Sequence, residues 1–411
     1  MGKTASNLRD RLRRIQEQKK IEKPQETGSS FDISALTDNG WETCGFKVLK
    51  KEVLLNTKYK LMRSAPESLG IVIPDLAGRA FPQYEDYLFF DLETTGLSGG
   101  AGTVAFLAAF GQFIIKKNTL NLHVTQYLLL DYPGENDFLD AVIKKIKTEK
   151  SVIVTYNGKC FDASILKTRC LMNGKKPPEF YHVDLLHPAR RLWKNIIHDC
   201  SQSSIETKIL GLDRSDDIPG ALAPEIWFEF LKTGRTERLT GICEHNCSDI
   251  AGLSSVLMSM ISIASDPFDE KYNYDIERLA VYWRRFIKHQ ERLCEKENKY
   301  LKKTGNELLL IAAQKNCPRA AYIYAYDKLG SGNYSEGIKR LINIAESAFP
   351  ENIKAAALRT LAIDSERRLK DTAKALVFAK KGLKILPADT ALHNEFEKRY
   401  QRLEKKLSTN H

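Results

Sequence analysis

The sequence predicts an α/β fold, a mixed sheet flanked by helices, followed by an all-α helical tail. Apolar runs with the length of buried strands occur at residues 87–93, 104–113, 120–130 and 151–156. Segments of helical periodicity follow them, so strands and helices alternate as in an α/β layer fold. From about residue 269 the strand-like runs stop and long charged helices take over. The run at 87–93 is typical of a strand in a largely parallel sheet, since its apolar residues are nearly continuous.

Composition and charge narrow the class of protein. The chain has 411 residues, 43% hydrophobic and 28% charged, which suits a soluble protein of two or three domains. The formal net charge of +11 and the pI of about 9.1 favour a polyanionic partner such as nucleic acid. A protein that is merely rich in lysine would show the same charge.

Cysteine usage and the hydrophobic runs indicate a compartment. The eight cysteines are scattered and form no disulfide framework, which fits a reducing compartment. The N-terminus lacks the apolar core of a signal peptide, and the longest uncharged run, residues 250–265, is shorter than a bilayer requires. We therefore expect a cytoplasmic protein that does not enter membranes, with residues 250–265 in a core helix.

Four segments divide the chain. Residues 1–30 predict a basic N-terminal arm and linker, and residues 31–84 a lead-in segment with short strands at 46–55. The predicted catalytic domain is residues 85–265, and the helical tail is residues 270–411.

Two carboxylates stand at the end of the strand at residues 87–93. Side chains alternate along a strand, so Asp91 and Glu93 lie on one face, a few ångströms apart. Two like charges this close are unfavourable unless a cation, a shared proton or solvent relieves them. A divalent metal is the first hypothesis.

Two further acids are candidates for the same site. Asp162 begins the helix at 163–172, where its simplest role is to cap that helix. His245 and Asp249 are four residues apart in the helix at 239–262 and so share one face. Such a polar pair is usually surface decoration, and the alternative is a catalytic pair directed at Asp91.

Taken in order, these motifs resemble the DEDD superfamily of 3′–5′ exonucleases, which have a ribonuclease H-like fold. The first motif is Asp91-Leu-Glu93-Thr-Thr-Gly, the second spans residues 157–162, and the third spans residues 245–249. A closer resemblance, to the YprB-type ribonuclease H-like domain proteins, rests on five short matches. These are residues 97–103, 156–162, 184–193, 216–220 and 244–246. Members of that group often carry a tetratricopeptide-like tail.

The resemblance implies a role for each acid. Asp91 would bridge two Mg²⁺ or Mn²⁺ ions, Glu93 and Asp249 would complete the site of the ion that holds the attacking water, and Asp162 would support the second ion. His245 would orient or deprotonate that water. The superfamily's histidine branch places its histidine five residues before the last Asp and its tyrosine branch uses four. Here a histidine stands at the spacing of four.

Six residues next to the acids are predicted to contact substrate. They are Thr94, Thr95, Gly96, Leu97, Asn157 and Lys159. For Asn157 and Lys159, turn formation is an equally good explanation. Hairpin formation explains the glycine-rich stretch after Gly96 better than a phosphate loop does, because the Gly-Lys-Ser/Thr ending is missing.

The tail predicts helical repeats. A long helix is expected at residues 276–299, and two later segments echo each other, with Pro350 and Pro387 37 residues apart. That period is close to that of tetratricopeptide-like hairpins. Such arrays bind protein partners, and the alternative is that the tail buttresses the catalytic domain.

The leading functional hypothesis is a metal-dependent hydrolase, a 3′–5′ exonuclease that cleaves phosphodiester bonds of DNA or RNA by a two-metal mechanism. Its substrate would be a single strand or a 3′ end. The runner-up is a structure-selective endonuclease on the same fold. The alternative outside enzymes is a catalytically silent nucleic-acid-binding or scaffold protein.

Overall fold

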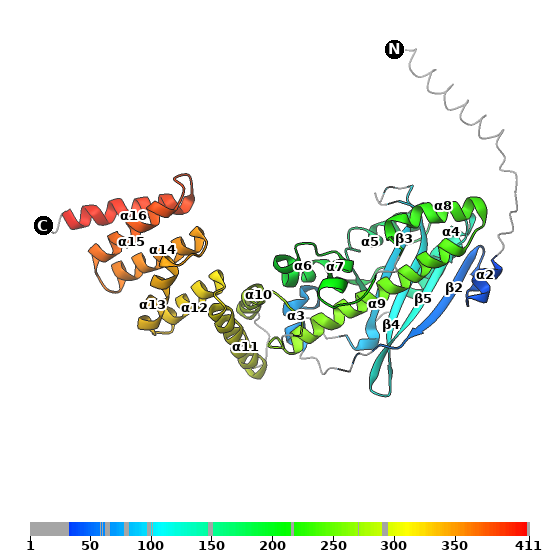
Figure 1. The fold of residues 1–411 in the computed structure, drawn as a ribbon, viewed down its shortest axis with the longest axis horizontal. Coiled ribbons are helices and arrows are strands. Elements are labelled where there is room, and N and C mark those ends of the chain that lie inside the picture. The colour runs from blue at the N-terminus through cyan, green and yellow to red at the C-terminus, as the bar shows by residue number, and fades with distance from the viewer. Residues whose placement is uncertain are drawn as a thin grey trace, which may run out of the picture.

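The computed structural model describes residues 33–57, 59, 61, 66–77, 82–96, 100, 102–146, 151–214, 218–269, 271–289 and 295–408. The arm and linker predicted at residues 1–30, and Leu97, lie outside these residues. Figure 1 shows a sheet with helices packed on it, from which a series of helices extends to one side.

One seven-stranded sheet forms the centre of the first part. Its strands, in spatial order, are β1 (Glu42–Gly45), β2 (Val48–Leu55), β5 (Thr119–Leu129), β4 (Ala105–Lys116), β3 (Tyr87–Thr94), β6 (Val152–Thr155) and β7 (Tyr181–Asp184). Pairing is antiparallel from β1 through to β3 and parallel from β3 through β6 to β7. The mixed sheet that the sequence predicted is therefore confirmed.

The neighbours of β3 correct one expectation. A largely parallel sheet around β3 is wrong, because β4 lies antiparallel beside it and only β6 is parallel to it. The stretch between β3 and β4 is too short for a parallel crossover, which needs a dozen or more residues. Thr95 and Val104 close this hairpin with a backbone hydrogen bond of 2.9 Å.

The predicted lead-in segment contributes to the same sheet. β2 pairs with β5 along its whole length, from Val48 opposite Leu129 to Leu55 opposite Leu122. The boundary predicted at residue 85 therefore runs through one sheet. The sequence showed the strand at 46–55 but not its partner far along the chain.

Helices cover both faces of the sheet. One face is covered by α3 (Pro66–Val72), α6 (Leu186–Ile197) and α9 (Glu237–Ser265), and the other by α4 (Glu135–Ile146), α5 (Asp162–Met172) and α8 (Ala223–Thr233). Residues of β3 alternate between these cores, with Phe89 in the first and Phe90 in the second. Asp91 and Glu93 continue the face of Phe89, so they point toward α9.

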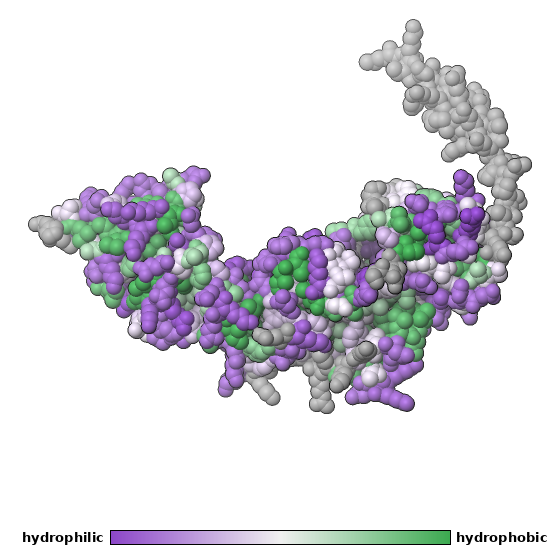
Figure 2. All heavy atoms as spheres, viewed as in Figure 1, coloured by the Kyte–Doolittle hydropathy of each residue, from purple (hydrophilic) through white to green (hydrophobic). Residues whose placement is uncertain are grey.

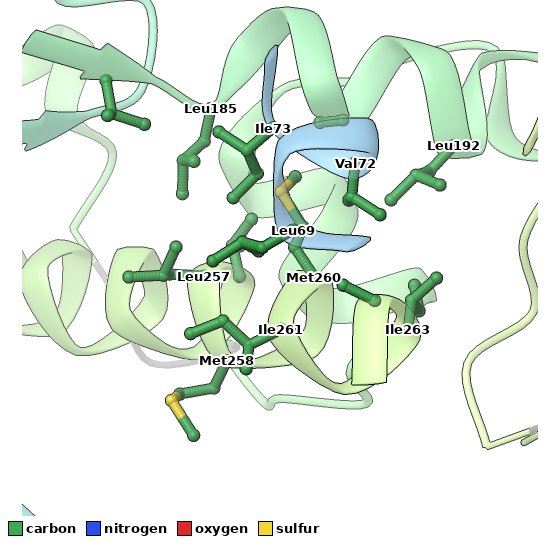
Figure 3. Packing of buried hydrophobic residues seen from close by; sticks show 14 of the residues in the cluster. Leu69, Val72, Ile73, Leu185, Leu192, Leu257, Met258, Met260, Ile261 and Ile263 are labelled. Carbon is green, nitrogen blue, oxygen red and sulfur yellow. The ribbon is translucent and has the colours of Figure 1, made fainter. Parts of the chain in front are cut away.

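The first core packs α3 between α6 and α9. Figure 3 shows Leu69, Val72 and Ile73 lying between Leu257 of α9 and Leu192 of α6. All five side chains are almost completely buried. This packing fixes α9 on the sheet and thereby fixes the polar residues that α9 carries.

α9 approaches the sheet closely. A Cβ at Gly111 of β4 would overlap the side chain of Ile250, so glycine is required where the helix crosses the strand. A window of α9 has a mean hydropathy of 1.5, apolar enough for a membrane span, but 67% of that window is buried inside the protein. Packing against the sheet thus accounts for the apolar character of α9.

The tail consists of helices that pack in sequence. They are α10 (Ile276–His289), α11 (Glu295–Gln314), α12 (Pro318–Gly330), α13 (Tyr334–Glu346), α14 (Glu351–Arg367), α15 (Thr372–Ile385) and α16 (Ala391–Ser408). Figure 2 shows hydrophilic side chains over much of the visible tail surface, with apolar patches between them. The helical tail is as predicted, and its tetratricopeptide-like nature stays a prediction.

The single helix expected at residues 276–299 is wrong. Trp283 Nε1 donates a hydrogen bond of 3.0 Å to the carbonyl of Leu301. In one continuous helix these two residues would lie about 27 Å apart, at 1.5 Å per residue. The chain therefore reverses between α10 and α11, and burial of Trp283 in their contact outweighs the continuous helical periodicity.

α10 attaches the tail to the sheet part. The backbone N–H of Asp275 donates to Leu192 O of α6 at 2.8 Å, and the Arg278 guanidinium donates to Arg190 O at 2.9 Å. The Arg191 guanidinium lies 4.9 Å from the ring centre of Tyr282, a cation–π contact.

Candidate active site

The three predicted acidic motifs meet at one edge of the sheet. β3 and β6 run parallel, so their C-terminal ends lie at the same edge. Asp91 and Glu93 are near the end of β3, and Asp162, the first residue of α5, follows β6. α9 packs on β3 and presents His245 and Asp249 from one face. These five side chains are the candidate site, called the acid cluster below.

Three members of the acid cluster lie close enough to share one metal ion. One carboxylate oxygen each of Glu93 and Asp249 and one ring nitrogen of His245 lie within 4.8 Å of one another. His245 Nε2 is 3.2 Å from Asp249 Oδ2 and 3.9 Å from Glu93 Oε1. Carboxylate oxygens suit Mg²⁺ and Mn²⁺, and imidazole suits several transition metals. The donor set fits a divalent cation, and the spacing of four residues turns His245 toward the acids.

Asp91 is held by two buried amides that the sequence did not single out. Asn246 Nδ2 donates to Asp91 Oδ2 at 2.7 Å, and Gln126 Nε2 donates to Asn246 Oδ1 at 3.0 Å. Gln126 Nε2 also donates to the carbonyl of Cys243 at 2.8 Å. Both amides are buried. Gln126 borders the apolar run at 127–130, which is a sequence signal for a buried polar residue, whereas Asn246 stands among polar residues and gives no such signal.

Asp162 is fixed against the first motif. Asp162 is 5% exposed, and its carboxylate accepts a hydrogen bond from the backbone N–H of Leu92, which lies between Asp91 and Glu93. Gly158 leaves room for this carboxylate, because a Cβ there would lie 2.8 Å from Asp162 Oδ2. Asp162 therefore does more than begin α5: it faces the acids of β3.

Burial makes the ionised carboxylates unfavourable. Burial, followed by the negative charge of Asp249, raises the pKa of Asp91 to about 7. Burial, followed by the charge of Asp91, also raises the pKa of Glu93 and that of Asp162. A nearby cation would offset the effect of burial on these carboxylates, because a cation stabilises the ionised form. The electrostatics therefore agree with the donor set on a cation site.

Arg214 is part of the site and was missed from the sequence. Its guanidinium donates to Glu206 Oε2 at 2.7 Å and lies 2.6 Å from Asp249 Oδ1. Glu206 is 1% exposed and lies on α7 (Gln202–Lys208), where Gln202 donates to Glu206 Oε1 at 2.8 Å. Gln202 also donates to the backbone carbonyl of Asp249 at 2.8 Å.

A glycine makes room for this network. A Cβ at Gly252 would overlap the Glu206 carboxylate, so α9 can accept the buried acid only at a glycine. An isolated glycine within a long apolar helix was the available sequence signal for a close approach.

Arg214 also determines the proton position on His245. The guanidinium lies 3.3 Å from His245 Nδ1 and has no acceptor, so Nδ1 accepts. The ring proton is thereby assigned to Nε2, which donates toward Asp249 Oδ2. In this arrangement His245 is a donor to the cluster, and it becomes a base only when Nε2 is free of its proton.

The predicted substrate residues after β3 make structural hydrogen bonds. The hydroxyl of Thr94 donates to Gly96 O, and that of Thr95 accepts from the backbone N–H of Val104, both at 2.9 Å. These bonds shape the hairpin next to the acid cluster, and Leu97 lies outside the described residues.

The predicted substrate residues after β6 form the turn that the sequence also allowed. Asn157 has a φ of 65°, and the backbone N–H groups of Asn157 and Lys159 donate to the Asp184 carboxylate at 2.8 and 3.1 Å. The Lys159 ammonium is 2.7 Å from Asp75 Oδ2. Both side chains are exposed, and Lys159 is directed to Asp75.

A pocket of about 450 Å³ opens onto the acid cluster. It is lined by Asp91, Asp249, His245, Arg214, Tyr156, Gln202, Ser203 and residues 218–220. Gly220 covers His245, since a Cβ there would lie 2.9 Å from Nε2. The pocket gives a ligand access to the acids from the side of α7.

Comparisons with known proteins agree with this geometry. A family model described as RNase_H superfamily matches residues 88–261. YprB of Bacillus subtilis (strain 168), which is itself uncharacterized, is 37% identical over 220 residues, or 51% of each chain. The chain thus spans about half the length of this curated relative. The resemblance predicted from the motifs is confirmed: residues 88–261 match the RNase_H superfamily, and half of the chain is similar to YprB.

Proposed function

We propose that the protein is a metal-dependent nuclease, a 3′–5′ exonuclease that hydrolyses phosphodiester bonds of DNA or RNA. The observation that supports this most is the convergence of four acids from β3, α5 and α9 at a pocket of a ribonuclease H-like domain. Burial disfavours the ionised forms of Asp91, Glu93 and Asp162 unless a cation is present. A hydrolase that positions phosphate esters with divalent ions needs such a cluster of carboxylates to bind those ions.

The chain's own residues would divide the work. Glu93 and Asp249 would hold one ion together with Asp91, and Asp162 would support a second ion beside Asp91. His245, whose Nε2 lies beside Asp249, would orient or deprotonate the attacking water. Bound Mg²⁺ or Mn²⁺ supplies charge stabilisation of the phosphoryl group and a more acidic water. Asn246 orients Asp91, Gln202 and Arg214 orient Asp249, and Tyr156 lines the route to the acids.

The test is hydrolysis of oligonucleotides labelled separately at the 5′ and the 3′ end, as single strands and as duplexes. We expect stepwise shortening from the 3′ end with Mg²⁺ or Mn²⁺ and none with EDTA. Asp91→Asn should reduce the rate by roughly a thousandfold or more, since a metal ligand contributes several kcal/mol to transition-state stabilisation. Asp389→Asn, at an exposed acid of the tail, is the matched control and should leave the rate unchanged.

The same hydrolysis experiment, with the products separated by length on a gel, distinguishes the alternatives. Internal fragments from both labels would favour a structure-selective endonuclease instead. No metal-dependent cleavage of any DNA or RNA substrate would overturn the nuclease proposal.

A second candidate function is nucleic-acid binding without cleavage. One observation favours it: the Arg214 guanidinium already neutralises Asp249, a ligand that a catalytic ion needs. Strand binding that is the same in EDTA and in Mn²⁺, without turnover, would select this candidate.

A further inference from the structure

A basic groove lies in the tail, away from the acid cluster. It encloses about 500 Å³ between α10, α11 and α12. Four exposed cationic side chains line it: Arg285, Lys288, Lys302 and Arg319. Val281, Ile287 and Ile323 supply apolar surface, and no acidic side chain is among the described residues that line the groove.

Several arginines of the tail are held in ion pairs, unlike these four cations. Arg359 pairs with Glu395 at 2.7 Å and Arg399 with Glu366 at 2.8 Å. At the rim of the groove Arg284 pairs with Asp327. For the four groove cations, the described part of the chain shows no ion pair. A cluster of like charges without counter-charges is favourable only in solvent or with an anionic ligand.

We propose that this basic groove binds the phosphate backbone of a single nucleic-acid strand. Successive phosphates offer a row of charges that matches several cations in one groove, and guanidinium groups such as those of Arg285 and Arg319 bind phosphate oxygens in pairs. The apolar surface of Ile287 and Ile323 suits sugars and bases, which carry no charge.

The position of the groove agrees with this ligand. α10, which carries Arg285 and Lys288, is fixed to α6 through Asp275 and Arg278. Along the chain, α6 is followed directly by α7, and α7 lines the pocket of the acid cluster. A strand held on α10–α12 is therefore held by the same molecule as a strand end in that pocket. The inference does not depend on cleavage, because backbone binding in the groove requires no metal.

The test measures fluorescence anisotropy of a labelled single-stranded oligonucleotide with the full chain in EDTA, over a series of salt concentrations. A variant with glutamine at all four groove cations should bind the strand at least roughly tenfold more weakly than the unchanged chain. The slope of log K against log salt should fall by about 3, since each lost phosphate contact contributes about 0.7 for single strands.

The matched control removes the same charge elsewhere in the tail. It carries glutamine in place of four exposed lysines of α13, α15 and α16: Lys339, Lys374, Lys380 and Lys398. We expect its affinity and salt slope to remain close to those of the unchanged chain, and thermal melting should show both variants folded. The single reversal Arg285→Glu provides a second test with less change of sequence and should also weaken binding.

Three results would overturn the proposal. One is equal loss of affinity in the two four-residue variants, and another is no loss in either. The third is displacement of the strand by polyglutamate of equal charge, which would identify an acidic protein segment as the ligand. Failure of the nuclease proposal would appear separately, as absent cleavage with groove binding intact.

Discussion

Two pockets of similar size in this chain carry opposite charge. The pocket at the acid cluster measures about 450 Å³ and the basic groove of the tail about 500 Å³. Asp162 and Glu206 near the first are almost completely buried, whereas the four cations of the second are exposed. Buried like charges need partners, and here Asn246, Gln202 and Arg214 supply them. Exposed like charges are screened by water and remain available to a ligand.

The largest expected effect tests the chemistry of the acid cluster. His245→Gln should lower kcat on a 3′-labelled strand by about 10²–10⁴-fold, which is the usual contribution of a positioned acid–base group. His187→Gln, at an exposed histidine of α6, is the control and should leave kcat unchanged. Equal kcat for both variants would remove His245 from the proposed proton transfer, and strand binding in the basic groove should be unaffected in either case.

Loss of a buried charge partner should rank second. Arg214→Gln leaves Glu206 buried without its cation, which should lower the free energy of unfolding by about 3–5 kcal/mol in urea denaturation. Arg285→Gln removes an exposed arginine of the basic groove and should change it by less than about 0.5 kcal/mol. If the two variants had equal stabilities, the contrast between the pockets would be wrong. Adding Glu206→Gln to Arg214→Gln should recover much of the loss.

The pH dependence of stability should follow the raised pKa of Asp91. Because its pKa is raised from 3.8 to about 7, the folded state disfavours ionised Asp91, and stability from this group falls as pH rises between these values. Without metal, Asp91→Asn should therefore raise the free energy of unfolding above pH 7 by on the order of a few kcal/mol, which a higher Tm would report. Below pH 4 the substitution should have little effect.

Mn²⁺ gives the complementary measurement. It should raise the Tm of the unchanged chain above pH 7 and do so less at lower pH, where protons compete for Asp91. The four-glutamine variant of the basic groove should respond to Mn²⁺ as the unchanged chain does. A Tm that is indifferent to Mn²⁺ at every pH would contradict a cation site at the acid cluster.

The smallest effect compares two helical glycines. Gly252→Ala should lower the free energy of unfolding by about 1–3 kcal/mol, because the added methyl overlaps the Glu206 carboxylate. Gly330 of α12 has open space around it, so Gly330→Ala should be neutral or stabilising by up to about 1 kcal/mol. Chemical denaturation of the two variants measures the difference, and a stabilising Gly252→Ala would show that Glu206 can move aside.

Local periodicity was enough to predict part of the site. Strand alternation placed Asp91 and Glu93 on one face, and helical spacing placed His245 with Asp249. Arg214 and Glu206 could not be predicted in this way. Their partners come from other elements, and each stands in an unremarkable polar stretch. The reversal between α10 and α11 was missed for a similar reason: burial of Trp283 against Leu301 has no periodic signature.

Strand register decides whether the acid cluster can form in this chain. Asp91 stands opposite Ala109 and Glu93 opposite Leu107 in the pairing of β3 with β4. A slip of β3 by one residue would preserve most backbone hydrogen bonds but would turn Leu92 toward α9 and both acids toward α4 and α5. A chain that refolds with this error would keep its sheet and lose the acid cluster. Recovery of secondary structure after denaturation is therefore a poor measure of a correctly formed acid cluster.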